Sequence, residues 1–158
     1  MTLPDASSVA MRPAVLQDVD ALVAIDAACF PTEIAYPREE ITSLLRTSTV
    51  LTLVAECGSS IVGFATLGLL QHCGHRCGEL ITIDVLPQFR RKGLGAQMHN
   101  ELEKWLRAGG GASMDLHVAV TNLAALHFYQ GLGYRILARI PHYYPNATDA
   151  WRMRKNLA

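Results

Sequence analysis

Residues 81–96 read ITIDVLPQFRRKGLGA, and this stretch contains the local signals from which the rest of the chain can be interpreted. Its first residues are apolar and β-branched, which favours a strand, and Pro87 ends that strand. From Ala96 to Ala108, apolar residues recur near the three-and-four spacing of a helix with one buried face. The stretch therefore predicts a strand, a glycine turn and a helix that begins at Gly95.

A strand, a glycine turn and a helix in this order can form a binding site for an anion. The first amides of a helix have no partner within the helix, and the helix dipole places partial positive charge beside them. Glycine lets a phosphate approach the backbone closely. A nucleotide-triphosphate loop would need Gly-Lys-Ser/Thr, and a dinucleotide fold would need GxGxxG. The stretch has neither, and its pattern is Arg90-x-x-Gly93-x-Gly95.

This pattern, with its strand and helix, resembles the pyrophosphate loop of the GNAT acyltransferases, a superfamily of acetyl-CoA-dependent N-acetyltransferases. A second segment, NLAALHFYQGLGY at residues 122–134, resembles the family signature N-x-x-A-x-x-F/L-Y-x-x-x-G-F/Y that follows strand five. The tail, with Tyr143-Tyr144-Pro145, Asp149-Ala150 and Met153, is similar to that of RimI-like ribosomal-protein and other protein N-alpha-acetyltransferases. The resemblance extends over residues 9–157.

Length and composition limit the class of protein. A chain of 158 residues fits one domain, so we expect residues 1–158 to form a single GNAT-like domain with a loose start at residues 1–8. The formal net charge of zero gives no general attraction for nucleic acid or for an anionic membrane. No apolar run approaches the roughly 18 residues of a membrane span, and the start lacks the layout of a signal peptide. We therefore expect a cytoplasmic protein.

Hydrophobic periodicity and turn residues divide the chain into strands and helices. Because hairpins pair strands antiparallel and helical crossovers pair them parallel, the order of elements predicts an α/β (α+β) fold. We expect a GNAT-like, mixed but mostly antiparallel sheet of about seven strands, flanked by about four helices. The predicted strands are 9–14, 49–55, 61–70, 79–85, 113–118, 135–140 and 151–157, and the predicted helices are 19–29 with Asp18 as its cap, 38–46, 95–108 and 122–130.

The segment QHCGHRCG at residues 71–78 has the composition of a metal site. Its cysteines and histidines lie too close together to surround one tetrahedral ion easily, and it contains no CxxC pair. We therefore predict a solvated turn between two strands and no metal. Free thiols are expected at Cys29, Cys57, Cys73 and Cys77, because nothing in the sequence indicates an oxidising compartment.

The resemblance implies how acetyl-CoA, the expected cosubstrate, would be held. The backbone of Ile83 and Val85 would pair with the pantetheine arm, and an amide of the same strand would polarise the thioester carbonyl. Asn122 would bind the cofactor near its amide arm. The full set of expected cofactor residues is Ile83, Asp84, Val85, Arg90, Arg91, Lys92, Gly93, Leu94, Gly95, Ala96 and Asn122.

The resemblance also implies catalytic residues. Tyr129 resembles the general acid of the family, although an amphipathic helix could also bury it as a core aromatic. Two candidates remain for the base, Glu79 and His117, which could act together through a water molecule. A eukaryotic relative with histidine at the position of His117 pairs it with a tyrosine, and the chain has Gly78 at that tyrosine's position.

The expected acceptor is the N-terminal α-amine of a protein or peptide. In relatives, two loops bracket the peptide, which here places Phe30, Pro31, Glu33 and Tyr36 on one side and the pair Tyr143–Tyr144 on the other. A small-molecule amine or a lysine is the alternative acceptor within the same fold. An acetyl-CoA-binding sensor without activity is the alternative outside the enzyme class.

Overall fold

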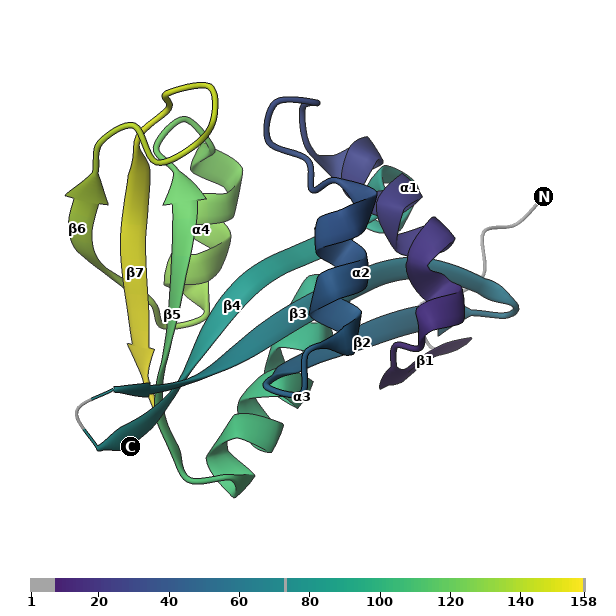
Figure 1. The fold of residues 1–158 in the computed structure, drawn as a ribbon, viewed down its shortest axis with the longest axis horizontal. Helices are drawn as coiled ribbons and strands as arrows, with labels where there is room; N and C mark the ends of the chain where they lie inside the picture. Colours follow the sequence, from purple (N-terminus) through teal and green to yellow (C-terminus); the bar gives the residue numbers. More distant parts are fainter. Residues whose placement is uncertain (1–7, 73, 158) are drawn as a thin grey trace.

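The computed structural model describes residues 8–72 and 74–157, so all of the expected loose start, residues 1–8, except Ser8 lies outside these ranges. All the predicted strands and helices are present (Figure 1). None of the helices in the described ranges is long and apolar enough to cross a membrane. The elements are β1 (Val9–Pro13), η2 (Leu16–Asp18), α1 (Val19–Cys29), α2 (Arg38–Arg46), β2 (Val50–Cys57), β3 (Ser60–His72), β4 (His75–Val85), η3 (Pro87–Phe89), α3 (Leu94–Ala108), β5 (Gly111–Ala119), α4 (Leu123–Gly131), β6 (Arg135–Ile140) and β7 (Ala150–Asn156).

The strands form a seven-stranded sheet with the order β1-β2-β3-β4-β5-β7-β6. Among the described strands, β4 and β5 form the parallel pair, and they are joined by the crossover helix α3. The other neighbouring strands are antiparallel, as expected for hairpins and for a tail that folds back. The predicted mixed, mostly antiparallel sheet is therefore confirmed.

Helices cover both faces of the sheet. Because side chains alternate along each strand, neighbouring residues of one strand belong to different cores. On β3, Phe64 belongs to the core beneath α1 and α2, whereas its neighbour Ala65 belongs to the core beneath α3. The larger core contains the buried face of α3, formed by Leu94, Met98, Leu102 and Leu106, with parts of α4 packed against it. In Figure 1, α1 and α2 lie on the opposite side of the sheet from α3.

Two local predictions need correction. Residues 71–78 were expected in a solvated turn, but 71–72 belong to β3 and 75–78 belong to β4, and the two strands pair as far as His75 opposite His72. The β-hairpin continues because regular cross-strand pairing satisfies more backbone groups than an open loop would. Asp18 was expected to cap α1 with its side chain, yet its carboxylate accepts from the Val15 amide at 2.8 Å and pairs with Arg12 at 2.8 Å.

The centre of the sheet separates into two arms. β4 and β5 pair from Arg76 to Glu79 of β4, but β4 continues to Val85 and β5 continues to Ala119. Thr82 pairs with Thr66 while Leu80 pairs with Leu67, so Ile81 is an extra residue in β4. Such a β-bulge bends a strand and increases its twist. Figure 1 shows β4 and β5 diverging beyond this point.

We predict that Gly63→Ala destabilises the protein by about 1–3 kcal/mol, as overpacking does in a close-packed interior. Gly63 lies opposite Val85, and an added Cβ would come within 2.8 Å of the Asp84 carbonyl oxygen and 3.3 Å of the Met98 methyl group. Urea unfolding would measure the loss. Gly131→Ala is the matched control, because an added Cβ there meets nothing within 4 Å. Equal stabilities of the two variants would contradict this account of β4.

Candidate active site

The upper part of β4 presents an edge without a neighbouring strand to the region between the two arms of the sheet. The Leu86 amide donates to the Val62 carbonyl of β3 at 2.9 Å. Because neighbouring residues of an antiparallel strand point their backbone groups in opposite directions, Ile83 and Val85 face away from β3. Beyond Glu79 that edge has no partner in β5. An extended molecule with amide groups could therefore pair with Ile83 and Val85, as the resemblance implies.

Asp84 lies in a different environment from these two neighbours. Its backbone pairs with Phe64 of β3, and the residue is only 1% exposed. Its carboxyl group turns toward α1 rather than toward β5, so a contact between Asp84 and the cofactor stays a prediction.

The turn that follows β4 leads into the exposed N-terminus of α3. Gly93 caps the helix with φ of 80°, a left-handed conformation that favours glycine. The first bond of the helix runs from the Gln97 amide to the Gly93 carbonyl at 3.0 Å, so the amides of Leu94, Gly95 and Ala96 precede it. A Cβ on Gly95 would approach the Phe128 ring at 3.3 Å. The start of α3 thus offers backbone N–H donors, and Gly95 among them has no room for a side chain. Donors of this kind suit a diphosphate.

Three basic side chains surround this turn. The Arg90 Nε donates to the Val85 carbonyl at 2.9 Å, which places its guanidinium group at the upper end of β4. Arg91 is exposed and adopts φ of 63°, while the Lys92 Nζ lies 5.7 Å from the centre of the Phe89 ring. Local positive charge is therefore present beside the free amides, although the chain as a whole is neutral.

Asn122 begins α4, where its side chain accepts a hydrogen bond from the Ala125 amide at 3.1 Å. This is the usual role of asparagine at a helix N-cap. Its expected contact with the cofactor is a second role, which stays a prediction.

Both candidates for the base lie where β4 and β5 separate. Glu79 is the last residue of β4 that pairs with β5, and its Oε1 is 3.7 Å from the Nδ1 of His117 on β5. This distance is longer than a direct hydrogen bond, so the two groups are neighbours without a direct bond. The Tyr143 ring stacks on the His117 ring with centres 4.3 Å apart and an angle of 10° between the planes. The sequence alternatives are therefore parts of one cluster.

Tyr129 approaches the site from α4. Burial raises its pKa above the ordinary value, and the neighbouring Asp84 and Tyr144 raise it further. Its ring also makes edge contacts with Phe128 and Tyr134, at centre distances of 5.3 and 5.7 Å. Tyr129 is thus packed against the core and directed toward the divided part of the sheet, so the two interpretations offered by the sequence are compatible.

The two loops expected to bracket the acceptor meet through their tyrosines. Burial raises the pKa of Tyr36, and Tyr143, Asp26 and Tyr144 raise it further. Burial, followed by the influence of Tyr143, raises the pKa of Tyr144 to about 12. The loop after α1 and the loop between β6 and β7, which lie near each other at the top of Figure 1, therefore bring three neutral hydroxyl groups into one region.

The remaining loop residues differ in exposure. Phe30 is half-buried, whereas Pro31 and Glu33 are exposed on the loop, where the Pro31 carbonyl accepts from the amides of Ile34 and Ala35. Their contact with an acceptor stays a prediction.

Gly78 cannot supply the tyrosine of the eukaryotic relative. A side chain at Gly78 would point into the core, where its Cβ would lie 2.6 Å from Leu106 and 2.8 Å from Leu67. The group that lies beside His117 is therefore the carboxylate of Glu79, on the next residue of β4.

Sequence reasoning missed Asp26 of α1, which is completely buried behind the site. Its Oδ2 accepts from the Tyr36 amide at 2.6 Å, and its carboxyl group lies beside that of Asp84 on β4. A signal was present in the sequence, because Asp26 follows Leu22 and Ile25 on the apolar face of a predicted helix.

The described residues contain no group of three or more His, Cys, Asp or Glu side chains that could hold a metal ion. Cys73, from the segment that resembled a metal site, lies outside the described ranges. Within them, Cys29, Cys57 and Cys77 are free thiols.

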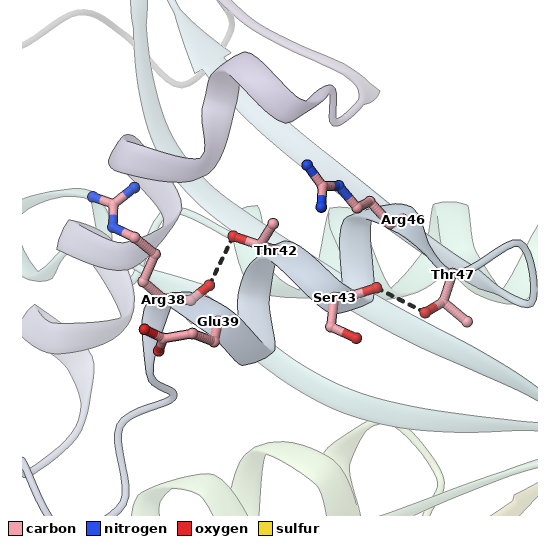
Figure 2. A pocket seen from close by; sticks show the side chains of 6 residues that line it. All are labelled: Arg38, Glu39, Thr42, Ser43, Arg46 and Thr47. Atoms are coloured by element: carbon pink, nitrogen blue, oxygen red, sulfur yellow. Dashed lines mark hydrogen bonds between the residues drawn. The ribbon is translucent and has the colours of Figure 1, made fainter.

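The hollow on the outer side of α2 is separate from this site. It is lined by Arg38, Glu39, Thr42, Ser43, Arg46 and Thr47 (Figure 2). The Thr42 hydroxyl donates to the Arg38 carbonyl at 2.8 Å, and the Thr47 hydroxyl donates to the Ser43 carbonyl at 2.7 Å. Both hydroxyl donors are thus used within the helix. None of the expected site residues lines this hollow.

Comparison with known proteins agrees with this geometry. The chain is 28% identical over 153 residues, 90% of each chain, to a protein of Sulfurisphaera tokodaii named N-alpha-acetyltransferase. The crystal structure of the Escherichia coli ribosomal-protein-S18-alanine N-acetyltransferase has the same fold, with a TM-score of 0.83, 22% identity and coverage of 95% of this chain and 94% of that chain. Arabidopsis thaliana Naa50, in complex with the bisubstrate analogue CoA-Ac-MVNAL, superposes with a TM-score of 0.81, 22% identity and coverage of 94% and 98%.

The sequence profile of the acetyltransferase (GNAT) family matches residues 19–134, from the start of α1 to the end of the segment that carries Tyr129. This range includes the glycine turn, the unpaired edge of β4 and the cluster of Glu79 and His117. The chain therefore belongs to the GNAT family and is an acetyl-CoA-dependent N-acetyltransferase.

Proposed function

We propose that this enzyme acetylates the N-terminal α-amine of a protein or peptide, as a RimI-like acetyltransferase of the cytoplasm. The observation that supports this most directly is the cluster of Glu79, His117 and Tyr143 at the point where β4 and β5 separate. It provides a proton acceptor and an aromatic wall beside the unpaired backbone edge of β4.

The residues of this chain can support each requirement of the reaction. Acetyl-CoA supplies the acetyl group as a thioester. The amine nitrogen forms a bond to the acetyl carbon, the carbon–sulfur bond breaks, the nitrogen loses a proton and the sulfur gains one. Amides of Leu94, Gly95 and Ala96 would hold the diphosphate, and the backbone of Ile83 and Val85 would align the extended arm.

Glu79 and His117 would receive the proton of the amine. The Glu79 Oε1 and the His117 Nδ1 are 3.7 Å apart, so both side chains are close enough to serve one proton transfer. Tyr143, stacked on the imidazole, keeps the His117 ring in one orientation. We therefore treat the two residues as one base rather than as alternatives.

Tyr129 would provide the proton for the departing sulfur. Its reference pKa near 10 already exceeds that of a thiol, near 8.5, so full transfer costs at least about 2 kcal/mol. Burial raises this cost in the free protein. Tyr129 would thus act mainly by donating a hydrogen bond to the sulfur as negative charge develops there.

The ionisation of the acceptor favours an α-amine over a lysine. With a pKa near 7.8, roughly ten per cent of an α-amine is neutral at pH 7, against less than about 0.1 per cent of a lysine with a pKa near 10.4. An α-amine therefore demands less of the base than a lysine does. The name of the Sulfurisphaera relative, the ribosomal-protein S18 substrate of the Escherichia coli enzyme and the peptide analogue bound to Naa50 support the same choice.

The first prediction concerns the acceptor. A peptide library with varied first residues, incubated with acetyl-CoA and examined by mass spectrometry, should show acetylation at the α-amine. Peptides blocked at that amine but carrying an internal lysine should react at least about a hundredfold more slowly, following the difference in neutral amine. Turnover of polyamines or of lysine side chains in preference to every free N-terminus would exclude the proposal, and acetyl-CoA binding without turnover of any amine would identify a sensor.

The second prediction concerns Tyr129. Tyr129→Phe should lower kcat by about 10²-fold, as removal of a general acid does, and leave the KM for acetyl-CoA nearly unchanged. Tyr134→Phe is the control, since that hydroxyl binds the His99 Nε2 at 2.8 Å within the core. The control should lose stability but retain kcat. If both variants lost activity and stability together, Tyr129 would have only a structural role.

The third prediction concerns the shared base. Glu79→Gln and His117→Asn should each lower kcat/KM. Because both residues serve one proton transfer, the fold-decrease in kcat/KM of the double variant should be much smaller than the product of the two single fold-decreases. Steady-state kinetics of the three variants would measure the coupling. Exposed Glu101→Gln on α3 is the matched control for removing a carboxylate. Independent, multiplicative losses would contradict a common base.

A further inference from the structure

Two aspartates from distant parts of the sequence face each other in the interior beside the acceptor loop. Asp26 of α1 is 0% exposed and Asp84 of β4 is 1% exposed. Each uses one carboxyl oxygen for a neighbour, since Asp26 Oδ2 accepts from the Tyr36 amide at 2.6 Å and Asp84 Oδ1 accepts from the Thr82 hydroxyl. The remaining oxygens, Asp26 Oδ1 and Asp84 Oδ2, are buried without a donor among the described residues.

These two remaining oxygens can satisfy each other only if a proton lies between the carboxyl groups. Two ionised carboxylates in an apolar interior repel strongly, whereas an acid and a carboxylate form a short charge-assisted hydrogen bond. The surroundings are apolar, since Leu22, Ile25 and Phe64 belong to the same core. Burial, with the hydrogen bond to Asp26 as the next cause, raises the pKa of Asp84 to about 9. The pair therefore retains one proton at neutral pH.

We infer that Asp26 and Asp84 share one proton and act as a positioning pair, which seats the acceptor loop, residues 30–37, against β4 at the active site. The inference deepens the proposed function and rests on it, because residues 30–37 matter here as part of the acceptor site. Neither aspartate needs to touch a substrate, and the effect is transmitted through the Tyr36 amide.

The pair joins two parts of the site, the acceptor loop and the edge of β4. Asp26 holds the backbone of Tyr36, next to the hydroxyls of Tyr143 and Tyr144. Asp84 lies between Ile83 and Val85, whose backbone groups face the region between β4 and β5. A second link runs parallel to the pair, from the Cys29 thiol to the Val85 carbonyl at 3.4 Å. The position of the acceptor loop is thus tied to the edge of β4.

Below Asp84, a row of threonines holds β4 to the neighbouring strands of the sheet. Thr82 pairs across the strands with Thr66, and Thr66 pairs with Thr52. All three threonines are buried, and the hydroxyl oxygens of Thr52 and Thr66 are 3.0 Å apart. Since β4 is anchored in this way, loss of the shared proton should displace the loop rather than the sheet.

The groups that face the pair define its response to pH. Cys29 lies on the same helix as Asp26, Arg90 follows β4, Tyr129 approaches from α4 and Tyr36 belongs to the loop. Arg90 favours the ionised form of Asp84, but burial and Asp26 oppose it more strongly. The pKa of each of the three remaining groups is raised above its ordinary value, chiefly by burial, which favours the neutral form of each. Above about pH 9 the pair acquires its second negative charge.

The sign of the effect on stability follows from the raised pKa. An unfolded aspartate loses its proton near pH 3.9, whereas folded Asp84 keeps its proton up to about pH 9. The folded state binds the extra proton between these limits, so this residue's contribution to stability is complete below about pH 4 and declines as the pH rises to about 9.

The test uses Asp84→Asn, because asparagine can accept from Thr82 and donate to Asp26 without a titratable proton. In the wild type, the KM for a peptide acceptor should rise by up to about tenfold between pH 9 and pH 10, and in the variant it should stay flat. The acceptor is not the cause, since its α-amine is already neutral there. The KM for acetyl-CoA should not follow this change. Asp20→Asn, on an 82% exposed side chain of the same helix, should behave as the wild type.

A second measurement does not depend on catalysis. Carboxyl and amide NMR of the wild type should show one proton on the pair at pH 7, and the Tyr36 amide signal should change as that proton is lost near pH 9. Titration of both carboxyl groups below about pH 5, or a Tyr36 signal that is independent of them, would overturn the inference.

The outcomes also separate the two proposals. If no peptide is acetylated, the proposed function fails and the NMR titration still decides the pair. If peptides are acetylated but the wild type and Asp84→Asn show the same KM profile, the positioning role fails alone. If Asp84→Asn does not fold, Asp26→Asn serves instead, because its amide can accept from Tyr36 and donate to Asp84.

Discussion

The site depends on one constraint, which is that β4 and β5 cannot remain paired beyond Glu79. The extra residue Ile81 bends β4 away, and the backbone groups of Ile83 and Val85 then face an open edge. The edge of a strand that has no neighbouring strand can pair with an extended, strand-like molecule. The glycine turn lies at the end of the same strand, and it places the free amides of α3 where a diphosphate at the end of that molecule would lie.

The sequence predicted the elements of this arrangement whose causes are local. Pro87, Gly93 and the apolar spacing of α3 determine the end of a strand, a turn and a helix from neighbouring residues alone. The structure confirms the end of the strand at Val85 and both ends of the helix within a residue. The crossover through α3 also determines that β4 and β5 are parallel. The hairpins could also be predicted from the sequence, because turn residues and alternating patterns are local signals.

Contacts between distant segments could not be predicted in this way. Whether Glu79 and His117 compete or cooperate depends on the register of β4 against β5, which no local pattern reveals. Asp26 and Asp84 each appear as a single polar residue in an apolar run, and only the packing of α1 on β4 shows that they face each other. The length of β4 also required the structure, since a segment rich in glycine, histidine and cysteine gives a turn signal although cross-strand pairing makes it a strand.

The chemistry of the acceptor region favours a peptide backbone over a small polycation. Tyr36, Tyr143 and Tyr144 have raised pKa values, so each offers a neutral hydroxyl that can donate to a peptide carbonyl. A polyamine would instead need several accessible carboxylates. Asp26 and Asp84 are buried, and the shared proton leaves them only one negative charge. The carboxylate that remains near the acceptor amine is Glu79, which has His117 beside it. One carboxylate suits an acceptor with a single ammonium group that must lose a proton. We therefore infer that neutral hydroxyls select the acceptor and that the few charged groups serve its deprotonation.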